Sequence, residues 1–104
     1  MSFTEGSARS FTVESVRKNA PEVSGVYGLS NAREWIFIGE TNNIQARLME
    51  HLKETDTELA NRRPTGFAFE RCSPVERIHR QNALVQQFEP FCNRRMGYTR
   101  NYGR

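Results

Sequence analysis

Three polar side chains stand at positions where chemistry could take place. Arg47 and His51 are four residues apart in a predicted helix, so both lie on one face of it. Gln81 falls on the apolar side of a second predicted helix, where a polar side chain is out of place. A guanidinium can bind phosphate, and a buried amide needs hydrogen-bond partners or a role in a site. These residues are the first candidates for a functional site.

The charge of the chain is unevenly distributed. Residues 1–60 hold 6 basic and 9 acidic side chains, whereas residues 61–104 hold 9 arginines and 3 glutamates. Every cation of the second part is thus an arginine, which suits phosphate binding and base stacking. This distribution indicates a polyanionic partner, and an ordinary solvated basic face explains it equally well.

The composition is that of one small globular domain. The chain has 104 residues and a net charge of +3, with 37% hydrophobic and 26% charged residues. No stretch reaches the roughly 18 apolar residues of a membrane span, and residues 1–10 lack an apolar signal core. We therefore expect a cytoplasmic protein with no membrane partner. Cys72 and Cys92 form no CxxC pattern, which favours free buried thiols over a disulfide or a zinc site.

Turn residues and hydrophobic periodicity divide the chain into short elements. Thr12 can cap a first helix, and Asn42 or Asn43 a second. Two segments rich in β-branched and aromatic residues lie close enough to form a hairpin. The expected helices are Val13–Asn19, Ile44–Lys53 and Ser73 to about Phe88, and the expected strands are Val23–Leu29, Trp35–Gly39 and Phe67–Cys72.

The order of these elements favours an α+β fold with a three-stranded, largely antiparallel sheet flanked by helices. We expect residues 1–10 to form a flexible N-terminal tail, residues 11–93 one domain, and residues 94–104 a basic C-terminal tail. In the last helix, Ile78, Gln81, Val85 and Phe88 fall on one face, with Leu84 beside them. Gln81 is thus expected to face inward.

Two triplets and four later residues recur in the order of a known pattern. The set is Gly25-Val26-Tyr27, Phe37-Ile38-Gly39, Arg47, His51, Pro90 and Asn93. Each triplet alone is a weak signal, whereas the ordered set over residues 23–93, with fitting elements between its members, is specific. The chain resembles the GIY-YIG nuclease family, and the resemblance implies that family's fold and a DNA phosphodiester hydrolase ancestry.

The resemblance also implies roles for the matching residues. In the family pattern Tyr27 acts as a general base toward water, Arg47 steadies the charge on the phosphate, and His51 is a frequent polar partner. A free phenol has a pKa of about 10, so the role of Tyr27 requires help from a nearby cation or metal.

Two positions depart from the family. Counting back from Pro90 and Asn93 puts the family's catalytic glutamate, which holds one divalent metal (Mg²⁺ or Mn²⁺), on Gln81. An amide offers one neutral oxygen where a hard cation prefers a carboxylate. Phe37 lacks the hydroxyl of the family's second tyrosine. We therefore expect Gln81 and Phe37 to be degenerate catalytic positions, and no metal ligand in the chain as it stands.

The expected function is that of a nuclease-like domain whose hydrolysis is impaired or lost. One alternative is a non-catalytic nucleic-acid-binding module, and another is an engineered inactive variant of an active endonuclease. A protein-interaction domain that keeps only the fold is a third, against which the basic second part argues. Nucleic acid, and DNA by resemblance, is the expected partner. The candidate contacts are Arg47, Arg80, Arg94 and Arg95.

Overall fold

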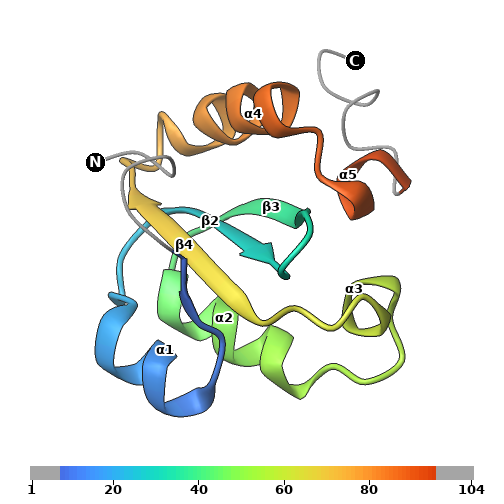
Figure 1. The fold of residues 1–104 in the computed structure, drawn as a ribbon. Coiled ribbons are helices and arrows are strands. Elements are labelled where there is room, and N and C mark those ends of the chain that lie inside the picture. Colours follow the sequence, from blue (N-terminus) through green and yellow to red (C-terminus); the bar gives the residue numbers. More distant parts are fainter. Residues whose placement is uncertain (1–7, 96–104) are drawn as a thin grey trace.

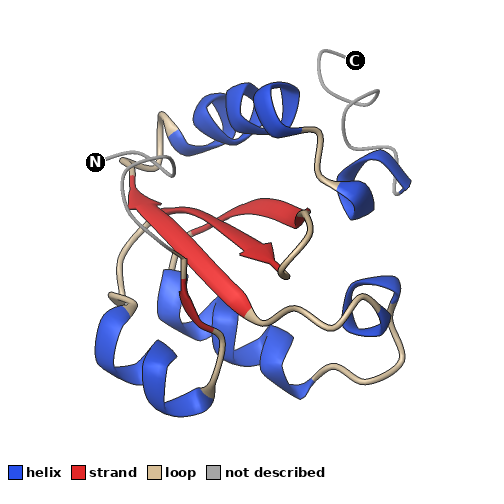
Figure 2. Ribbon diagram, in the orientation of Figure 1, coloured by secondary structure: helices blue, strands red, loops and turns tan. Residues whose placement is uncertain are grey.

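The computed structural model describes residues 8–95, which form one sheet covered by helices (Figures 1 and 2). The strands are β1 Arg9–Ser10, β2 Gly25–Ser30, β3 Trp35–Thr41 and β4 Gly66–Arg71, and the helices are α1 Val13–Asn19, α2 Ile44–Lys53, α3 Glu58–Asn61, α4 Arg77–Phe88 and α5 Phe91–Arg95. The expected α+β fold is thus confirmed. None of the helices in this part of the chain is both long and apolar enough to cross a membrane.

The sheet is antiparallel with the strand order β1-β4-β2-β3, so β2 lies inside it and β3 at one edge. In the β2–β3 hairpin Tyr27 is opposite Gly39 and Leu29 is opposite Phe37. Side chains two residues apart in a strand point to the same face. This register therefore puts Tyr27, Leu29 and Phe37 on one face of the sheet.

Each face of the sheet carries its own apolar core. On one face Tyr27 and Phe37 pack with Ile44 and Leu48 of α2, and α1 and α3 complete this layer. On the other face Val26 and Ile38 pack with residues of α4. Figure 1 shows the two layers, with α1 and α2 on one side of the sheet and α4 on the other. Helix α2, which carries Arg47 and His51, therefore covers the face of the sheet opposite to α4.

The structure differs from the sequence prediction at the edges of the domain. Residues 1–10 were expected to form a flexible tail, yet Arg9 and Ser10 form β1 and pair with β4, which makes a fourth strand. The chain after the last long helix turns at Glu89, whose φ of 46° ends α4, and then forms α5. Two exposed residues and a five-residue helix have too little hydrophobic periodicity to be recognised from sequence.

The prediction for α4 was wrong at its start. Ile78 was expected on the buried face and is 55% exposed, whereas Leu84 and Val85 are buried with Gln81. Residues 74–76 form a turn, and the helix begins only at Arg77. Val75 and Ile78 are 89% and 55% exposed, so the buried face of this segment begins only at Gln81. Cys92 is buried and Cys72 is half-buried, and both are free thiols.

Candidate active site

The β2–β3 hairpin places Tyr27 and Phe37 next to each other under α2. Their ring centroids are 6.1 Å apart, and their exposed fractions are 1% and 5%. Gly39, opposite Tyr27, lies directly against the phenol: a Cβ at this position would be 2.6 Å from the hydroxyl oxygen. The glycine of the second triplet therefore makes room for the hydroxyl of the tyrosine in the first triplet.

Helix α2 brings Arg47 and His51 to this phenol. The helix begins at a capping residue, Asn43, whose side chain accepts a hydrogen bond of 2.9 Å from the Ala46 amide. Ile44 and Leu48 anchor its apolar face in the core, which leaves Arg47 and His51 along the flank of that face. Spacing of four residues puts both side chains on one side of α2, as the sequence predicted, and both contact Tyr27 of the hairpin.

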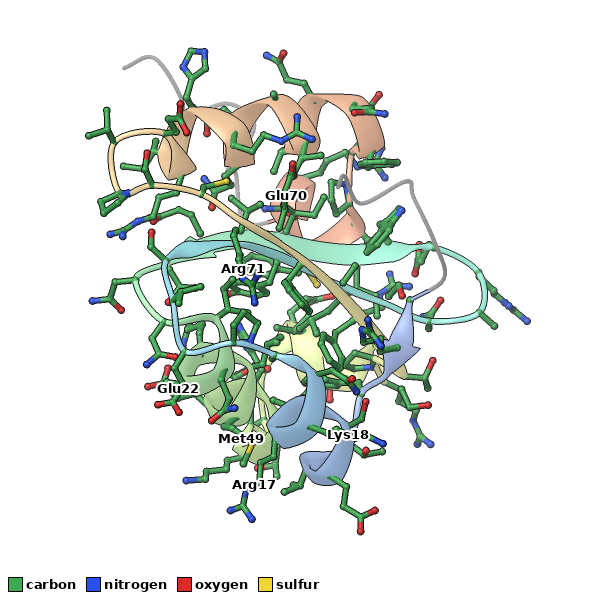
Figure 3. All side chains as sticks on the ribbon, turned by 90° about the vertical axis from the view of Figure 1, so that its left-hand side faces the viewer. Arg17, Lys18, Glu22, Met49, Glu70 and Arg71 are labelled. Atoms are coloured by element: carbon green, nitrogen blue, oxygen red, sulfur yellow. The ribbon has the colours of Figure 1, made fainter. Side chains whose placement is uncertain are left out.

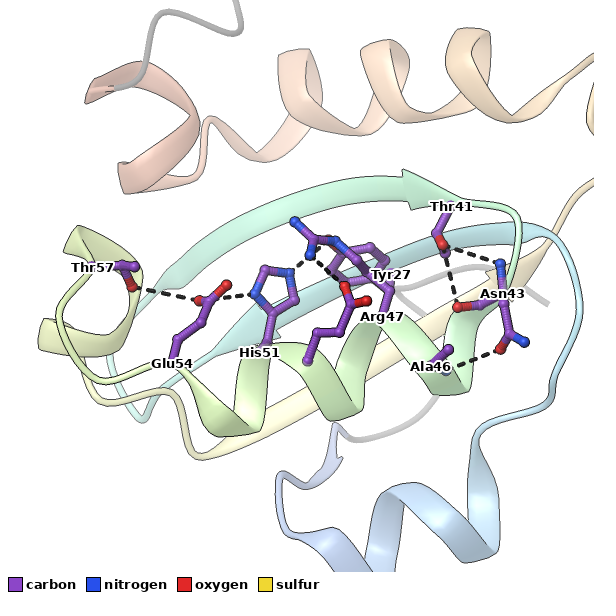
Figure 4. A network of polar contacts seen from close by, with 9 residues as sticks. Tyr27, Thr41, Asn43, Ala46, Arg47, His51, Glu54 and Thr57 are labelled. Carbon is purple, nitrogen blue, oxygen red and sulfur yellow. Dashed lines mark hydrogen bonds and ion pairs between the residues drawn. The ribbon is translucent and has the colours of Figure 1, made fainter.

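A chain of hydrogen bonds links the phenol to a carboxylate through the imidazole (Figure 4). The Tyr27 hydroxyl is 2.8 Å from His51 Nε2, and His51 Nδ1 is 3.1 Å from Glu54 Oε1. The side chain of His51 is 4% exposed. Thr57 Oγ1 donates to the same Glu54 oxygen over 3.5 Å. Sequence reasoning missed Glu54, although a glutamate three residues after a helical histidine can reach its ring.

Burial and nearby charges shift the pKa values of His51 and Arg47 in opposite directions. Burial lowers the pKa of His51 below its ordinary value, and the hydrogen bond with Glu54 opposes this without cancelling it. Burial also lowers the pKa of the Arg47 guanidinium, but its contacts with Glu50 and Tyr27 outweigh burial and raise it overall. His51 is therefore neutral and Arg47 charged at neutral pH.

Arg47 is held loosely enough to bind another anion. Its Nη1 is 2.7 Å from Glu50 Oε1, and the side chains of the two residues are 40% and 63% exposed. Exposed ion pairs of this kind contribute at most about 1 kcal/mol. A small pocket of about 150 Å³ lies beside the guanidinium, lined by Phe37, His51, Glu54 and other residues of α2 and α3.

Gln81 lies on the inward side of α4, as predicted, and is 9% exposed. Its amide donates a hydrogen bond of 3.4 Å to the side chain of the adjacent Asn82. α4 packs on β3 from the face opposite to α2, so Gln81 approaches the hairpin from the other side than Arg47 and His51 do. The structure thus gathers Tyr27, Phe37, Arg47 and His51 on one face of the sheet, whereas Gln81 lies on the helix that covers the other face.

Asn93, the last residue of the sequence pattern, binds the edge of the hairpin. Its Oδ1 accepts a hydrogen bond of 2.8 Å from the Ile38 amide, and its Nδ2 donates one of 2.9 Å to the Ile38 carbonyl. Asn93 is fully buried. The side-chain amide of Asn93 thereby makes the hydrogen bonds to the Ile38 backbone that a neighbouring strand would make.

Two curated bacterial proteins match part of this chain. It is 36% identical over 55 residues to the UvrABC system protein C of Aquifex aeolicus, a match covering 53% of this chain and 10% of that protein. With the UvrABC system protein C of a Hydrogenobaculum species it is 46% identical over 39 residues, which covers 38% of this chain and 7% of that protein. The chain thus spans about a tenth or less of the length of these relatives. No protein-family model matches it.

Solved structures with the same arrangement decide the fold. The GIY-YIG N-terminal endonuclease domain of UvrC from Thermotoga maritima, bound to magnesium as its catalytic cation, superposes with a TM-score of 0.63 and 23% identity, covering 75% of this chain and 94% of that one. A point mutant of the same domain, bound to its catalytic divalent cation, gives a TM-score of 0.63, 24% identity and the same coverage. The chain has the GIY-YIG fold. The expectation drawn from the two triplets is confirmed at the level of the fold.

The donors of this GIY-YIG domain do not fit a tightly bound hard cation. Mg²⁺ takes oxygen ligands and sheds its water reluctantly, so a carboxylate is its usual anchor in a protein. Gln81 offers one neutral oxygen. Within residues 8–95, no group of three or more histidine, cysteine, aspartate or glutamate side chains is arranged to hold a metal. Glu40, the acid that follows the second triplet, is bound to Arg77 at 2.7 Å.

The other candidate contacts for nucleic acid are partly neutralised within this GIY-YIG domain. Arg80 Nε donates to both carboxylate oxygens of Glu70 at 2.9 and 3.2 Å. Figure 3 shows Glu70 on the α4 side of the sheet, while the adjacent Arg71 points to the opposite face. Arg94 lies 3.8 Å from Glu89. The side chain of Arg95 lies outside the described residues.

Proposed function

We propose that this chain is a nucleic-acid-binding GIY-YIG domain, related to metal-dependent DNA phosphodiester hydrolases, in which hydrolysis is impaired because Gln81 replaces the metal-binding glutamate. The observation that supports this most is a disparity between the two faces of the sheet. Tyr27, Arg47 and His51 keep close contacts under α2, whereas the position on α4 carries a neutral amide. The magnesium bound by the Thermotoga maritima domain belongs to that protein, and we extend its role here only as a proposal.

The proposed contact with nucleic acid centres on Arg47. A phosphate oxygen can replace Glu50 on the guanidinium, because an exposed ion pair costs little to exchange. The phosphate then lies near the hydroxyl of Tyr27, the group that would take a proton from attacking water. Helix α4 has no acidic side chain that could bind a cation at this phosphate. The leaving oxygen therefore lacks charge stabilisation.

The sharpest experiment restores the carboxylate. We expect Gln81→Glu to gain Mg²⁺- or Mn²⁺-dependent nicking of supercoiled plasmid DNA, while the parent protein shows little or none. Gln86→Glu is the matched control, because it makes the same chemical change on the exposed face of the same helix. Isothermal titration with Mn²⁺ measures metal binding separately from cleavage.

A non-catalytic binding module and an engineered inactive variant give different results in the same assays. A non-catalytic binding module shifts DNA in a gel, more strongly at low salt, and stays inactive even as Gln81→Glu. An engineered inactive variant recovers full activity from Gln81→Glu alone, whereas a naturally drifted domain gains only part of it and needs Phe37→Tyr as well for the rest. Strong metal-dependent cleavage by the parent protein would contradict the proposal, and so would the absence of DNA binding at low salt.

A further inference from the structure

The hydrogen bonds around His51 have a direction that the chemistry of the three groups fixes. An ionised carboxylate only accepts hydrogen bonds, so Glu54 requires a proton on His51 Nδ1, 3.1 Å away. A neutral imidazole then has its lone pair on Nε2. The Tyr27 hydroxyl, 2.8 Å from that nitrogen, must therefore donate to it. The proton of the phenol already points at a base.

Glu54 is fixed in place by the backbone as well as by its side chain. It is the C-cap residue of α2, and its amide donates a hydrogen bond of 3.2 Å to the carbonyl of His51. The side chain and the main chain of Glu54 thus hold the same histidine, one at the ring and the other at the end of the helix. Thr57, which caps α3, donates to the carboxylate from the other side. Such support limits the rotamers open to the carboxylate.

We propose that Glu54 is a positioning residue of this site, which holds His51 in the tautomer that accepts the proton of Tyr27 and so prepares the phenol to act as a base without a bound cation. The proposal rests on the proposed function, because it assigns a role within the same site. It also answers how a buried phenol in this chain can lose its proton although the position on α4 is an amide.

The proton transfer balances without any further reactant than water and the phosphodiester. The O–H bond of Tyr27 breaks and an N–H bond forms on His51 Nε2, which leaves a phenolate beside Arg47 and an imidazolium beside Glu54. The phenolate takes a proton from water as the water oxygen bonds to phosphorus. The bond to the leaving oxygen breaks, and that oxygen keeps the electron pair and takes a proton from solvent. The proton on His51 Nε2 returns to solvent, which restores the neutral imidazole.

Charged groups from several elements bear on the protonation of His51. They are Arg47, Glu50 and Glu54 at α2, Tyr27 on β2, and Glu58 of α3, which lines the same pocket. Arg47 disfavours the imidazolium, and Glu50 and Glu54 favour it. Of these, Glu54 is the acid with a direct hydrogen bond to the ring. Its removal should therefore lower the pKa of His51 further.

Nitrogen-15 NMR of the histidine rings tests the role of Glu54 without any need for cleavage. We expect His51 in the parent protein to carry its neutral proton on Nδ1, with the exposed His79 as an internal reference. Glu54→Gln should lower the pKa of His51 and mix its tautomers. Glu50→Gln removes the same charge from the same helix without removing a hydrogen bond to His51, and should shift the titration less.

A second measurement reads the same role in cleavage. In the Gln81→Glu background, Glu54→Gln should lower nicking by about tenfold or more and move the acid limb of the pH–rate profile to lower pH. A merely structural role would lower the rate and leave the limb in place. If Gln81→Glu stays inactive, the proposed loss of a metal ligand fails, while the NMR titration still decides the role of Glu54. A neutral proton on Nε2, or equal titrations in the Glu54 and Glu50 variants, would overturn the proposal.

Discussion

At the scale of single residues, the site depends on how closely a glycine approaches a phenol. Gly39 leaves room for the Tyr27 hydroxyl, and that hydroxyl meets His51 in a space with almost no solvent. The glycine of the second triplet, on β3, therefore determines where the tyrosine of the first triplet, on β2, can lie.

Replacing this glycine by alanine tests that dependence. A Cβ at Gly39 would be 2.6 Å from the hydroxyl oxygen of Tyr27 and 2.8 Å from Cζ, so the ring must move away. We expect Gly39→Ala to destabilise the fold by about 1–3 kcal/mol in urea unfolding and to break the hydrogen bond with His51, visible in the ring nitrogen shifts.

Gly66→Ala is the control for Gly39→Ala. Gly66 is also a strand glycine, and a Cβ there would be 3.0 Å from Ser30 Oγ, the end of a side chain that can turn. We expect a smaller loss of stability and unchanged His51 shifts. Equal effects of the two variants would mean that glycine in a strand, and not room for the phenol, is what Gly39 supplies.

At the scale of elements, the edge strand β3 is completed by a side chain. Asn93 bonds both the amide and the carbonyl of Ile38, as another strand would do. An unpaired edge offers its polar backbone groups to other chains. Here α5 closes that edge at the residue between Phe37 and Gly39, and so ties the position of the second triplet to the end of the domain.

Asn93→Ala should therefore cost more than an ordinary surface change. It removes two hydrogen bonds and leaves two buried backbone groups of Ile38 without partners, which costs about 2–4 kcal/mol. Asn61→Ala, at an exposed position on α3, should change stability by less than about 0.5 kcal/mol. Chemical unfolding of both variants and amide exchange at Ile38 measure the difference, and fast exchange at Ile38 in the parent protein would refute it.

The sequence predicted the elements whose periodicity or capping is strong. The bounds of Val13–Asn19 and Ile44–Lys53 agree with α1 and α2, because Thr12 and Asn43 cap them as expected. The inward orientation of Gln81 also followed from periodicity. Pattern alone could not reveal β1 or α5, because each depends on what lies next to it in space, whereas the three-residue spacing of His51 and Glu54 was a local signal for their contact. For the same reason, only the fold shows that Gln81 lies on the helix that covers the face of the sheet opposite to α2.

At the scale of the whole molecule, much of the arginine excess is balanced locally. In the described part of the chain Arg62, Arg77, Arg80 and Arg94 each lie within 4 Å of a glutamate oxygen. Two of these acids, Glu34 and Glu40, come from residues 1–60, and two, Glu70 and Glu89, come from the arginine-rich part itself. The field available to nucleic acid is weaker than the charge count indicates, and binding should rest on few phosphate contacts.

The salt dependence of DNA binding tests this reduced number of contacts. Each phosphate contact contributes about −0.9 to the slope of log K against log salt concentration. If Arg47 holds one phosphate, Arg47→Ala should reduce the slope by about one and weaken binding to all sequences similarly. Arg33→Ala, which removes an exposed arginine from the β2–β3 turn, should leave the slope almost unchanged. Fluorescence anisotropy at several salt concentrations gives both slopes. Equal slopes for the parent and Arg47→Ala would place the DNA elsewhere on the molecule and would separate its binding from the site under α2.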